Sequence, residues 1–190
     1  MWYYSIFSMG YFFSVLFILF LFLPTFIGNG VPIVAKNIPF IKKFSTPVSE
    51  KYLWKNKTYR GFIAWIWWAI LTSILQYFLS DFIFIEVVRE RYITLIHTFD
   101  MALYVWTLQG VGALWGDAIK SFFKRKIWKK PGEAWLFFDG VDYIIGSVAL
   151  FSLVYVPNIL AIFFLMIAGP IASAVANIFA YCIKWKDVRY

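Results

Sequence analysis

The sequence predicts an all-α integral membrane protein with about five transmembrane helices, and three observations lead to that prediction. Hydrophobic residues occupy 62% of the 190 positions, charged residues occupy 15%, and the mean hydropathy is +0.73. The 10 Trp, 12 Tyr and 22 Phe residues exceed what a soluble globule of this size can bury. The apolar residues also gather in stretches of roughly 20, the length that crosses a hydrocarbon core about 30 Å thick. A water-soluble domain is therefore excluded.

The five spans follow from the apolar stretches taken in order. We expect spanning helices at residues 5–23, 61–80, 93–116, 141–156 and 159–183. Pro24 ends the first stretch, which lacks the basic start and the cleavage site of a signal peptide. His97 and Asp100 interrupt the third stretch, and we interpret them as a paired structural contact. The last apolar run is too long for one helix, and Pro157 divides it in two.

The basic residues orient these helices in the membrane. The loops at residues 24–60 and 117–140, together with the C-terminal tail, carry all of the 18 Lys and Arg residues except Arg89 and Arg91. Basic residues collect on the cytoplasmic side of membrane proteins. We therefore expect a multi-pass protein of the plasma membrane with its N-terminus outside, its C-terminus inside and both long loops in the cytoplasm. Residues 1–190 form one membrane-embedded domain.

Three carboxylates lie beside the second basic loop, where the charge rule does not require them. Asp117 ends the third span, and Asp139 and Asp142 are three residues apart at the start of the fourth. If the helix continues past residue 117, the same stripe presents further polar side chains, namely Lys120, Ser121 and Lys124, with Arg125 at its edge. Converging carboxylates repel one another unless a cation joins them, and hard oxygen ligands suit Mg²⁺ together with substrate phosphates. The alternative is a set of interfacial anchors and salt bridges at helix ends.

A second polar cluster, residues 55–61, stands at the entrance to the second span. Its members Asn56, Lys57, Thr58 and Arg60 can bind an anion through charge, hydroxyl and amide groups and the N–H groups of a helix start. A polybasic flank that anchors the helix explains the same residues equally well. A third patch, residues 28–32, contains Asn29 and is typical of a break or a re-entrant turn.

Taken together, these residues resemble the CDP-archaeol synthase family, the small archaeal-type member of the CDP-diglyceride synthase superfamily of integral membrane cytidylyltransferases. The resemblance rests on Ser121-Phe122-Phe123-Lys124-Arg125 followed by Asp139-Gly140-Val141-Asp142, on Gly116-Asp117, on the box from Asn56 to Gly61 and on the patch from Asn29 to Pro32. It covers nearly the entire chain. The sequence departs from the family near the C-terminus, where Ser173 stands in place of an expected histidine.

The resemblance implies a CTP-dependent enzyme. A membrane lipid phosphate would attack the α-phosphorus of CTP, releasing pyrophosphate and giving a CDP-activated lipid for phospholipid synthesis. The implied catalytic residues are Asp117, Asp139 and Asp142, which would bind the cofactor Mg²⁺, together with Lys124 and Arg125. The implied substrate-binding residues are Asn29, Asn56, Lys57, Thr58, Arg60, Lys120 and Ser121. The lipid would be an archaeal-type di-isoprenoid glycerol phosphate or a phosphatidate.

Two other functions are weighed against this one. A CDP-alcohol phosphotransferase also uses aspartates and Mg²⁺, but its Asp-Gly-x-x-Ala-Arg motif is absent around Asp139-Gly140. A small non-enzymatic scaffold or transporter subunit would bind anionic lipid through the basic face of the protein. Nucleic acid is not an expected partner, because the Trp and Tyr residues at the span edges are typical of an interfacial belt. A homodimer is left open.

Overall fold

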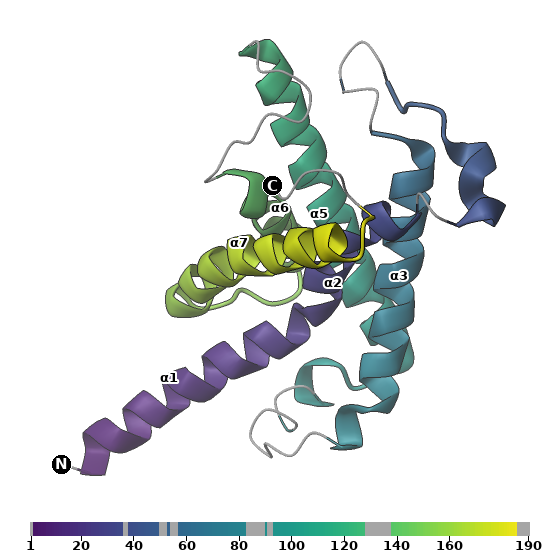
Figure 1. Cartoon of the computed structure of the whole chain (residues 1–190). Helices are drawn as coiled ribbons and strands as arrows, with labels where there is room; N and C mark the ends of the chain where they lie inside the picture. Colours follow the sequence, from purple (N-terminus) through teal and green to yellow (C-terminus); the bar gives the residue numbers. More distant parts are fainter. Residues whose placement is uncertain are drawn as a thin grey trace.

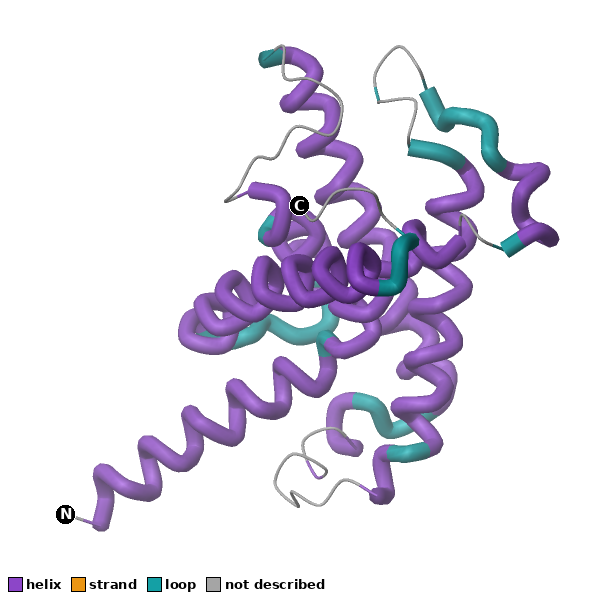
Figure 2. The backbone as a smooth tube through the Cα atoms, in the orientation of Figure 1, coloured by secondary structure: helices purple, strands orange, loops and turns teal. Residues whose placement is uncertain are grey.

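The structure, a computed structural model, describes residues 2–35, 38–49, 53, 57–82, 90, 93–127 and 138–185. These residues are mainly helical and include an isolated β-bridge between Pro47 and Thr58 (Figures 1 and 2). The main helices are α1 (Trp2–Leu21), α2 (Leu23–Ala35), α3 (Tyr59–Phe78), α5 (Phe99–Lys126), α6 (Asp142–Phe151) and α7 (Ile159–Cys182). Short 3₁₀ helices are η1 (Pro39–Phe44), η2 (Ser80–Phe82) and η3 (Phe138–Gly140). The predicted all-α class is confirmed for this part of the chain.

Three helical stretches of the described chain are long and apolar enough to cross a membrane, namely Phe12–Pro32, Tyr59–Phe78 and Ile159–Cys182. They correspond to the first, second and fifth predicted spans. α5 has 28 residues but is less apolar than these three, and α6 has 10 residues, fewer than the roughly 20 that a straight span needs. A membrane protein with several apolar helices is therefore shown, and the number five stays a prediction.

Pro24 does not end the first helix, contrary to the prediction from the sequence. α1 and α2 meet at Phe22, whose carbonyl accepts the Phe26 N–H at 3.1 Å, so the helical backbone continues to Ala35. Pro24 lies in the first turn of α2, where a backbone N–H has no partner within the helix, so its missing N–H costs little. The predicted loop of residues 24–60 thus begins only after α2, and Asn29 lies on a helix instead of a re-entrant turn.

α5 begins and ends later than the predicted span at residues 93–116. The Thr98 hydroxyl accepts the Met101 N–H at 3.2 Å and caps the start of the helix. His97 precedes α5 and Asp100 lies in its first turn, where a carboxylate favours the helix dipole. Both side chains are exposed, and the paired contact between them stays a prediction. At its other end α5 continues for ten residues into the predicted loop of residues 117–140.

The division between the last two helices is confirmed. α6 ends at Phe151, five residues earlier than the predicted helix at 141–156, and α7 begins just after Pro157. The Asn158 side chain caps α7, because its Oδ1 accepts the Ala161 N–H at 2.7 Å. The α7 helix agrees closely with the predicted span at 159–183 and passes through Pro170 without ending.

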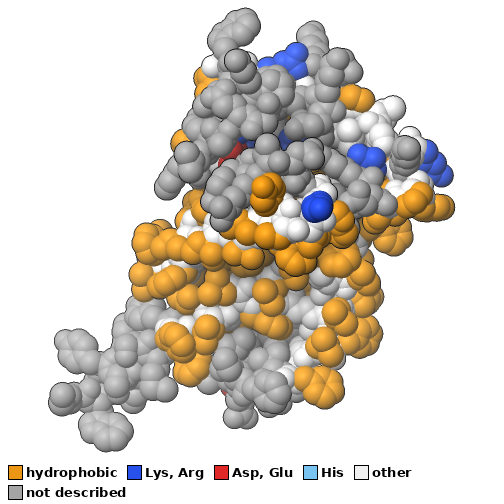
Figure 3. All heavy atoms as spheres, viewed as in Figure 1, with side chains coloured by type: hydrophobic (Ala, Val, Ile, Leu, Met, Phe, Trp, Pro, Cys, Tyr) orange, Lys and Arg blue, Asp and Glu red, His pale blue; other side chains and the backbone are white. Residues whose placement is uncertain are grey.

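The buried core lies where the helices meet. Trp65 of α3 and Trp106 of α5 are both almost completely buried. Phe22 packs edge-to-face against Phe151, with 5.5 Å between the ring centroids. Outside this core, apolar side chains cover the middle and lower parts of the face in Figure 3. The Lys and Arg side chains visible there lie in the upper half of the view, toward the start of α3 and the ends of α5 and α7 in Figure 1. On this face the visible basic side chains are thus separated from the apolar surface below.

Candidate functional site

The last turns of α5 carry the acidic and basic stripe that the helical period predicts. Because α5 continues to Lys126, Asp117, Lys120, Ser121 and Lys124 lie along one face of it. Ser121 is 2% exposed and Lys124 9% exposed. A lysine buried to this degree requires anionic partners nearby.

Glycines bring α6 close enough to supply one of those partners. A Cβ on Gly116 would lie 2.1 Å from the Asp142 carbonyl oxygen, and one on Gly112 would lie 2.3 Å from the Gly146 carbonyl oxygen. Neither contact is sterically allowed, so only glycine permits α5 and α6 to pack at this separation. The close approach sets Asp142, the first residue of α6, beside the face of α5 that carries Lys120.

The second carboxylate is held by a similar contact with α7. A Cβ on Gly140 would lie 2.4 Å from Pro170 Cα, and one on Gly169 would lie 2.6 Å from the Gly140 carbonyl oxygen. The Tyr143 hydroxyl also donates to the Gly169 carbonyl at 3.0 Å. These contacts fix η3, and with it Asp139, against the middle of α7.

The three predicted carboxylates converge on the ammonium group of Lys120. Its Nζ lies 2.8 Å from Asp142 Oδ2, 3.2 Å from Asp139 Oδ1 and 3.5 Å from Asp117 Oδ1. The side chain of Lys120 is 14% exposed, and that of Asp142 is 7% exposed. One lysine therefore bridges three acidic residues that come from α5, η3 and α6.

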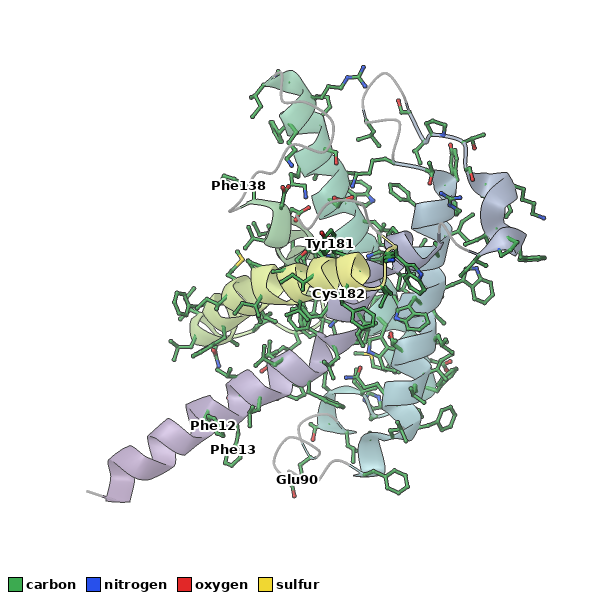
Figure 4. All side chains as sticks on the ribbon, in the orientation of Figure 1. Phe12, Phe13, Glu90, Phe138, Tyr181 and Cys182 are labelled. Carbon is green, nitrogen blue, oxygen red and sulfur yellow. The ribbon has the colours of Figure 1, made fainter. Side chains whose placement is uncertain are left out.

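Two further lysines complete the cluster. Lys57 forms an ion pair with Asp117, and Lys124 Nζ lies 2.6 Å from Asp139 Oδ1. Figure 4 shows side-chain oxygen and nitrogen atoms between α5 and η3, near the labelled Phe138. Among the described residues, the cluster thus contains three carboxylates and three ammonium groups, whose formal charges balance.

Lys57 reaches the cluster because the segment before α3 is held in place. The Lys57 carbonyl accepts the Val48 N–H at 2.8 Å, and the Tyr59 N–H donates to the Thr46 carbonyl at 3.1 Å. Thr58 then caps α3, with its hydroxyl accepting the Gly61 N–H at 3.3 Å. A residue 60 positions before Asp117 in sequence is in this way positioned beside it.

Electrostatics keep the central pair ionised. Burial alone would raise the pKa of Asp117, but the ammonium groups of Lys57 and Lys120 outweigh burial and hold that pKa below its ordinary value of 3.8. Burial would lower the pKa of Lys120, but Asp117, Asp142 and Asp139 outweigh it and raise that pKa above 10.5. Both groups are therefore charged throughout the neutral pH range.

One carboxylate oxygen of the cluster lacks a hydrogen-bond partner within the described part of the chain. Asp142 Oδ1 is buried and has no hydrogen-bond partner among the described residues, which is costly for a carboxylate oxygen. The same residues include no group of three His, Cys, Asp or Glu side chains arranged to hold a metal ion, and the Lys120 ammonium contacts all three carboxylates. The donor set of hard oxygens fits Mg²⁺, which commonly takes one or two carboxylates plus phosphate oxygens.

Arg125, Arg60 and Ser121 form other contacts within the described part of the chain. Arg125 Nη1 donates to the Leu53 carbonyl at 2.7 Å, and Arg60 Nη1 donates to the Ser45 hydroxyl at 3.0 Å. The Ser121 hydroxyl donates to the backbone carbonyl of residue 117 at 2.8 Å. Both arginines thus tie the basic segments around the charged end of the protein, while Ser121 bonds within its own helix.

Asn29 belongs to a separate contact between α2 and α7. Its Nδ2 donates to the Ser173 hydroxyl at 2.8 Å, at the position where the family resemblance leads us to expect a histidine. A cavity of about 230 Å³ adjoins this contact and is lined largely by apolar side chains, including those of Ile27, Val31 and Trp68. Asn56 lies outside the described residues.

Two features of the site were missed by sequence reasoning. The first is the glycine contact between α5 and α6, for which Gly112-x-x-x-Gly116 is an available signal, since this spacing is typical of closely packed membrane helices. The second is a buried polar group in which the Thr25 hydroxyl lies 3.4 Å from Gln109 Oε1 and 3.3 Å from the Ser147 hydroxyl. It links α2, α5 and α6 beneath the charged cluster.

Comparisons with known proteins identify the family to which the sequence is similar. A family model described as CarS-like, CDP-archaeol synthase, matches residues 12–190. A CDP-archaeol synthase of Methanoregula boonei is 29% identical over 168 residues, 84% of this chain and 89% of the relative. The CDP-archaeol synthase of Methanosphaerula palustris is 31% identical and covers 74% of this chain and 82% of the relative. That of Thermococcus onnurineus is 28% identical and covers 88% of this chain and 92% of the relative. No solved structure matches the chain.

Proposed function

The chain belongs to the CDP-archaeol synthase family, and from this premise we propose that it transfers CMP from CTP to an archaeal-type di-isoprenoid glycerol phosphate. Membership makes it a lipid cytidylyltransferase. The observation that carries the proposal to particular residues is the convergence of three carboxylates, from α5, η3 and α6, within 3.5 Å of one lysine nitrogen.

The reaction needs positioning and charge neutralisation more than covalent chemistry. An oxygen of the lipid phosphate forms a bond to the α-phosphorus of CTP, the bond from that phosphorus to the bridging oxygen breaks, and pyrophosphate leaves. Negative charge accumulates on the leaving pyrophosphate, so the protein accelerates the step by placing fixed cations around it. The three clustered lysines are suited to that role.

Asp117, Asp139 and Asp142 are the proposed ligands of Mg²⁺. When bound, Mg²⁺ supplies Lewis-acid neutralisation of the triphosphate oxygens. The support for these ligands is their hard oxygen chemistry, their common partner Lys120 and the unpartnered Asp142 Oδ1. Asp142 contributes most because it is the most buried of the three, and buried charges interact most strongly.

The basic residues divide between the two phosphate-bearing substrates. Lys57, Lys120 and Lys124 surround the carboxylates and are the proposed partners of the CTP phosphates. Arg60 and Arg125 stand on the rim of the cluster, where a forked guanidinium can receive the lipid phosphate. Four further residues are proposed to form hydrogen bonds with the substrates, in roles secondary to those of the charged residues: Asn29, Asn56, Thr58 and Ser121.

A cavity between α2, α3 and α7 is the proposed site for a lipid chain. It is lined largely by apolar side chains, including those of Ile27, Val31 and Trp68. Such a lining can contact an isoprenoid chain without burying unpaired polar groups. The proposed topology has five spans in the plasma membrane, an outer N-terminus and the charged cluster on the cytoplasmic side, supported by the segregation of basic residues.

A phosphatidate is the alternative substrate, and a scaffold that binds anionic lipid is the alternative function. The burial of Lys120 and Lys124, whose side chains are 14% and 11% exposed, argues against the scaffold. Lysines that attract a lipid surface act from exposed positions. These two are instead turned toward carboxylates inside the protein.

The test uses purified protein in lipid nanodiscs with α-³²P-labelled CTP, Mg²⁺ and either lipid phosphate. We expect label in a CDP-lipid, more rapidly with the di-isoprenoid substrate than with phosphatidate. Asp117→Asn should lower the rate by about 10²- to 10³-fold, the usual cost of removing one electrostatic contact to a transition state. Asp100→Asn, which alters an exposed carboxylate at the other end of α5, is the matched control and should keep the wild-type rate. Absence of labelled lipid with every lipid phosphate would overturn the proposal.

A further inference from the structure

We propose that Lys120 is a resident counter-ion that occupies the metal site of the empty enzyme and moves to the nucleotide phosphates when a divalent cation and CTP bind. This inference rests on the proposed function, because it assigns the order of events at the same site. It predicts that the divalent cation binds poorly on its own and well together with the nucleotide.

The contacts of Lys120 are those of a shared cation. Its Nζ lies 2.8–3.5 Å from oxygens of three carboxylates that belong to three different elements. Lys57 and Lys124 have a different geometry, since the ion pairs found for them among the described residues each involve one of these carboxylates. Lys120 is therefore the one of the three whose charge is shared by the whole acidic set.

Asp142 depends on Lys120 more than the other two carboxylates do. Asp117 also pairs with Lys57, and Asp139 also pairs with Lys124. The ion pair found for Asp142 in the described part of the chain is the one with Lys120. Since Asp142 is 8% exposed, removing Lys120 would leave this buried carboxylate without its counter-ion, so a divalent cation would no longer have to displace an ammonium group.

Asp142 also holds an oxygen ready for that cation. Its Oδ2 contacts Lys120, whereas its Oδ1 is buried without a hydrogen-bond partner among the described residues. Buried carboxylate oxygens are seldom left without partners. The free oxygen is explained if this carboxylate is arranged for a ligand that it takes up only during the reaction.

The lysine side chain at residue 120 can move away from the three carboxylates more easily than an arginine could. Lysine is a compact charge on a flexible four-carbon stem, and Lys120 lies three residues from Asp117 on α5, along the edge of the cluster. The phosphates of CTP would offer the displaced ammonium new anionic partners. Metal and nucleotide then favour each other's binding, and this coupling is reciprocal by thermodynamic necessity.

The experiment measures Mn²⁺ binding by electron paramagnetic resonance, with the full-length protein in nanodiscs and no nucleotide present. We expect Lys120→Met to bind Mn²⁺ about tenfold or more tightly than the wild type, within the range usual for coupled sites. Lys120→Arg retains the charge and should bind Mn²⁺ as weakly as the wild type. Lys126→Met, an exposed lysine at the end of the same helix, is the matched control and should also match the wild type.

A second substitution locates the gained affinity. In the Lys120→Met background, Asp142→Asn should remove the gain, because the released carboxylate is then no longer charged. Mn²⁺ binding by Lys120→Met that is no tighter than that of the wild type would overturn the inference. So would a gain that survives Asp142→Asn.

A thermal measurement covers the case in which Lys120→Met is poorly stable. Mg²⁺ alone should raise the melting temperature of this variant more than that of the wild type, and equal shifts would overturn the inference. The lipid-labelling assay separates the two proposals. If the wild type makes CDP-lipid and Lys120→Met binds Mn²⁺ no more tightly than the wild type, only the counter-ion role is refuted. If the wild type makes no CDP-lipid, the proposed function is refuted.

Discussion

Gly116→Ala isolates the packing between α5 and α6 that positions the site. A Cβ at residue 116 would lie 2.1 Å from the Asp142 carbonyl oxygen, whereas carbon and oxygen atoms in contact stay about 3.3 Å apart. The backbones must therefore separate by about 1.2 Å, the difference between those distances. Such a separation would lengthen the contact of 2.8 Å between Lys120 and Asp142 to about 4 Å, the limit for an ion pair.

Two losses follow from that displacement. Overpacking of this kind typically costs about 1–3 kcal/mol of stability, and a misplacement of about 1 Å at a reacting centre can cost about 10²-fold in rate. We expect Gly116→Ala to lower the melting temperature and to reduce kcat/KM for CMP transfer by about that factor. Gly30→Ala is the matched control for stability, because its Cβ would lie 3.5 Å from the nearest atom, Ala176 Cβ.

The measurements are CMP transfer from labelled CTP and thermal unfolding in the same nanodiscs. A variant that folds with wild-type stability and turns over at the wild-type rate would refute the reasoning, since it would mean that α5 and α6 are not in contact at residue 116. Reduced turnover with an unchanged KM for CTP would place the loss in the geometry of the transition state.

Three further predictions concern stability. Two lysines hold the pKa of Asp117 in the folded protein below its ordinary value of 3.8. The ionised carboxylate therefore stabilises the fold above pH 3.8, and this stabilisation is lost as the pH falls through the pKa of the folded state. Asp117→Asn should lower the melting temperature at pH 7, and the difference from the wild type should become smaller in acid. Tyr143→Phe removes the buried hydrogen bond of 3.0 Å to the Gly169 carbonyl. In denaturant titrations it should lower the free energy of unfolding by about 1 kcal/mol, and an unchanged free energy of unfolding would contradict that hydrogen bond. Thr98→Ala removes the hydroxyl that caps α5 and should lower the free energy of unfolding by about 1 kcal/mol without changing the KM for CTP. A changed KM would contradict a purely structural role for the start of α5.

The sequence predicted the acidic cluster because local rules determine most of it. The helical period places Lys120 and Lys124 on the face of Asp117 once the helix continues, and that continuation is what the structure has. The spacing of Asp139 and Asp142 places them in η3 and at the first residue of α6, close together in the chain. Their convergence with Asp117 was a hypothesis, on which the prediction of a cation depended.

The errors have equally physical causes. Pro24 was expected to end a helix, but a proline in the first turn of a following helix is tolerated, and the chain continues as α2. The third helix was expected to begin at residue 93, but the cap at Thr98 starts α5 after His97. In both places a local signal at a helix start outweighed the apolar pattern.

The role of Lys120 could not be predicted from the sequence. Its position on the stripe indicated a phosphate-binding residue, yet its contact with three carboxylates depends on how closely two helices approach. That approach is set by Gly112 and Gly116 against Gly146. The spacing Gly112-x-x-x-Gly116 indicates that α5 packs closely on some helix, but it does not identify α6 as the partner.

The convergence of the three carboxylates on one cation is best tested by anomalous X-ray diffraction from crystals grown with CTP and Mn²⁺. We predict a manganese peak within coordination distance of oxygens from at least two of Asp117, Asp139 and Asp142, with the Lys120 ammonium turned toward the triphosphate. A manganese peak bound by other residues while CTP is in place, or Lys120 still held among the three carboxylates, would contradict it.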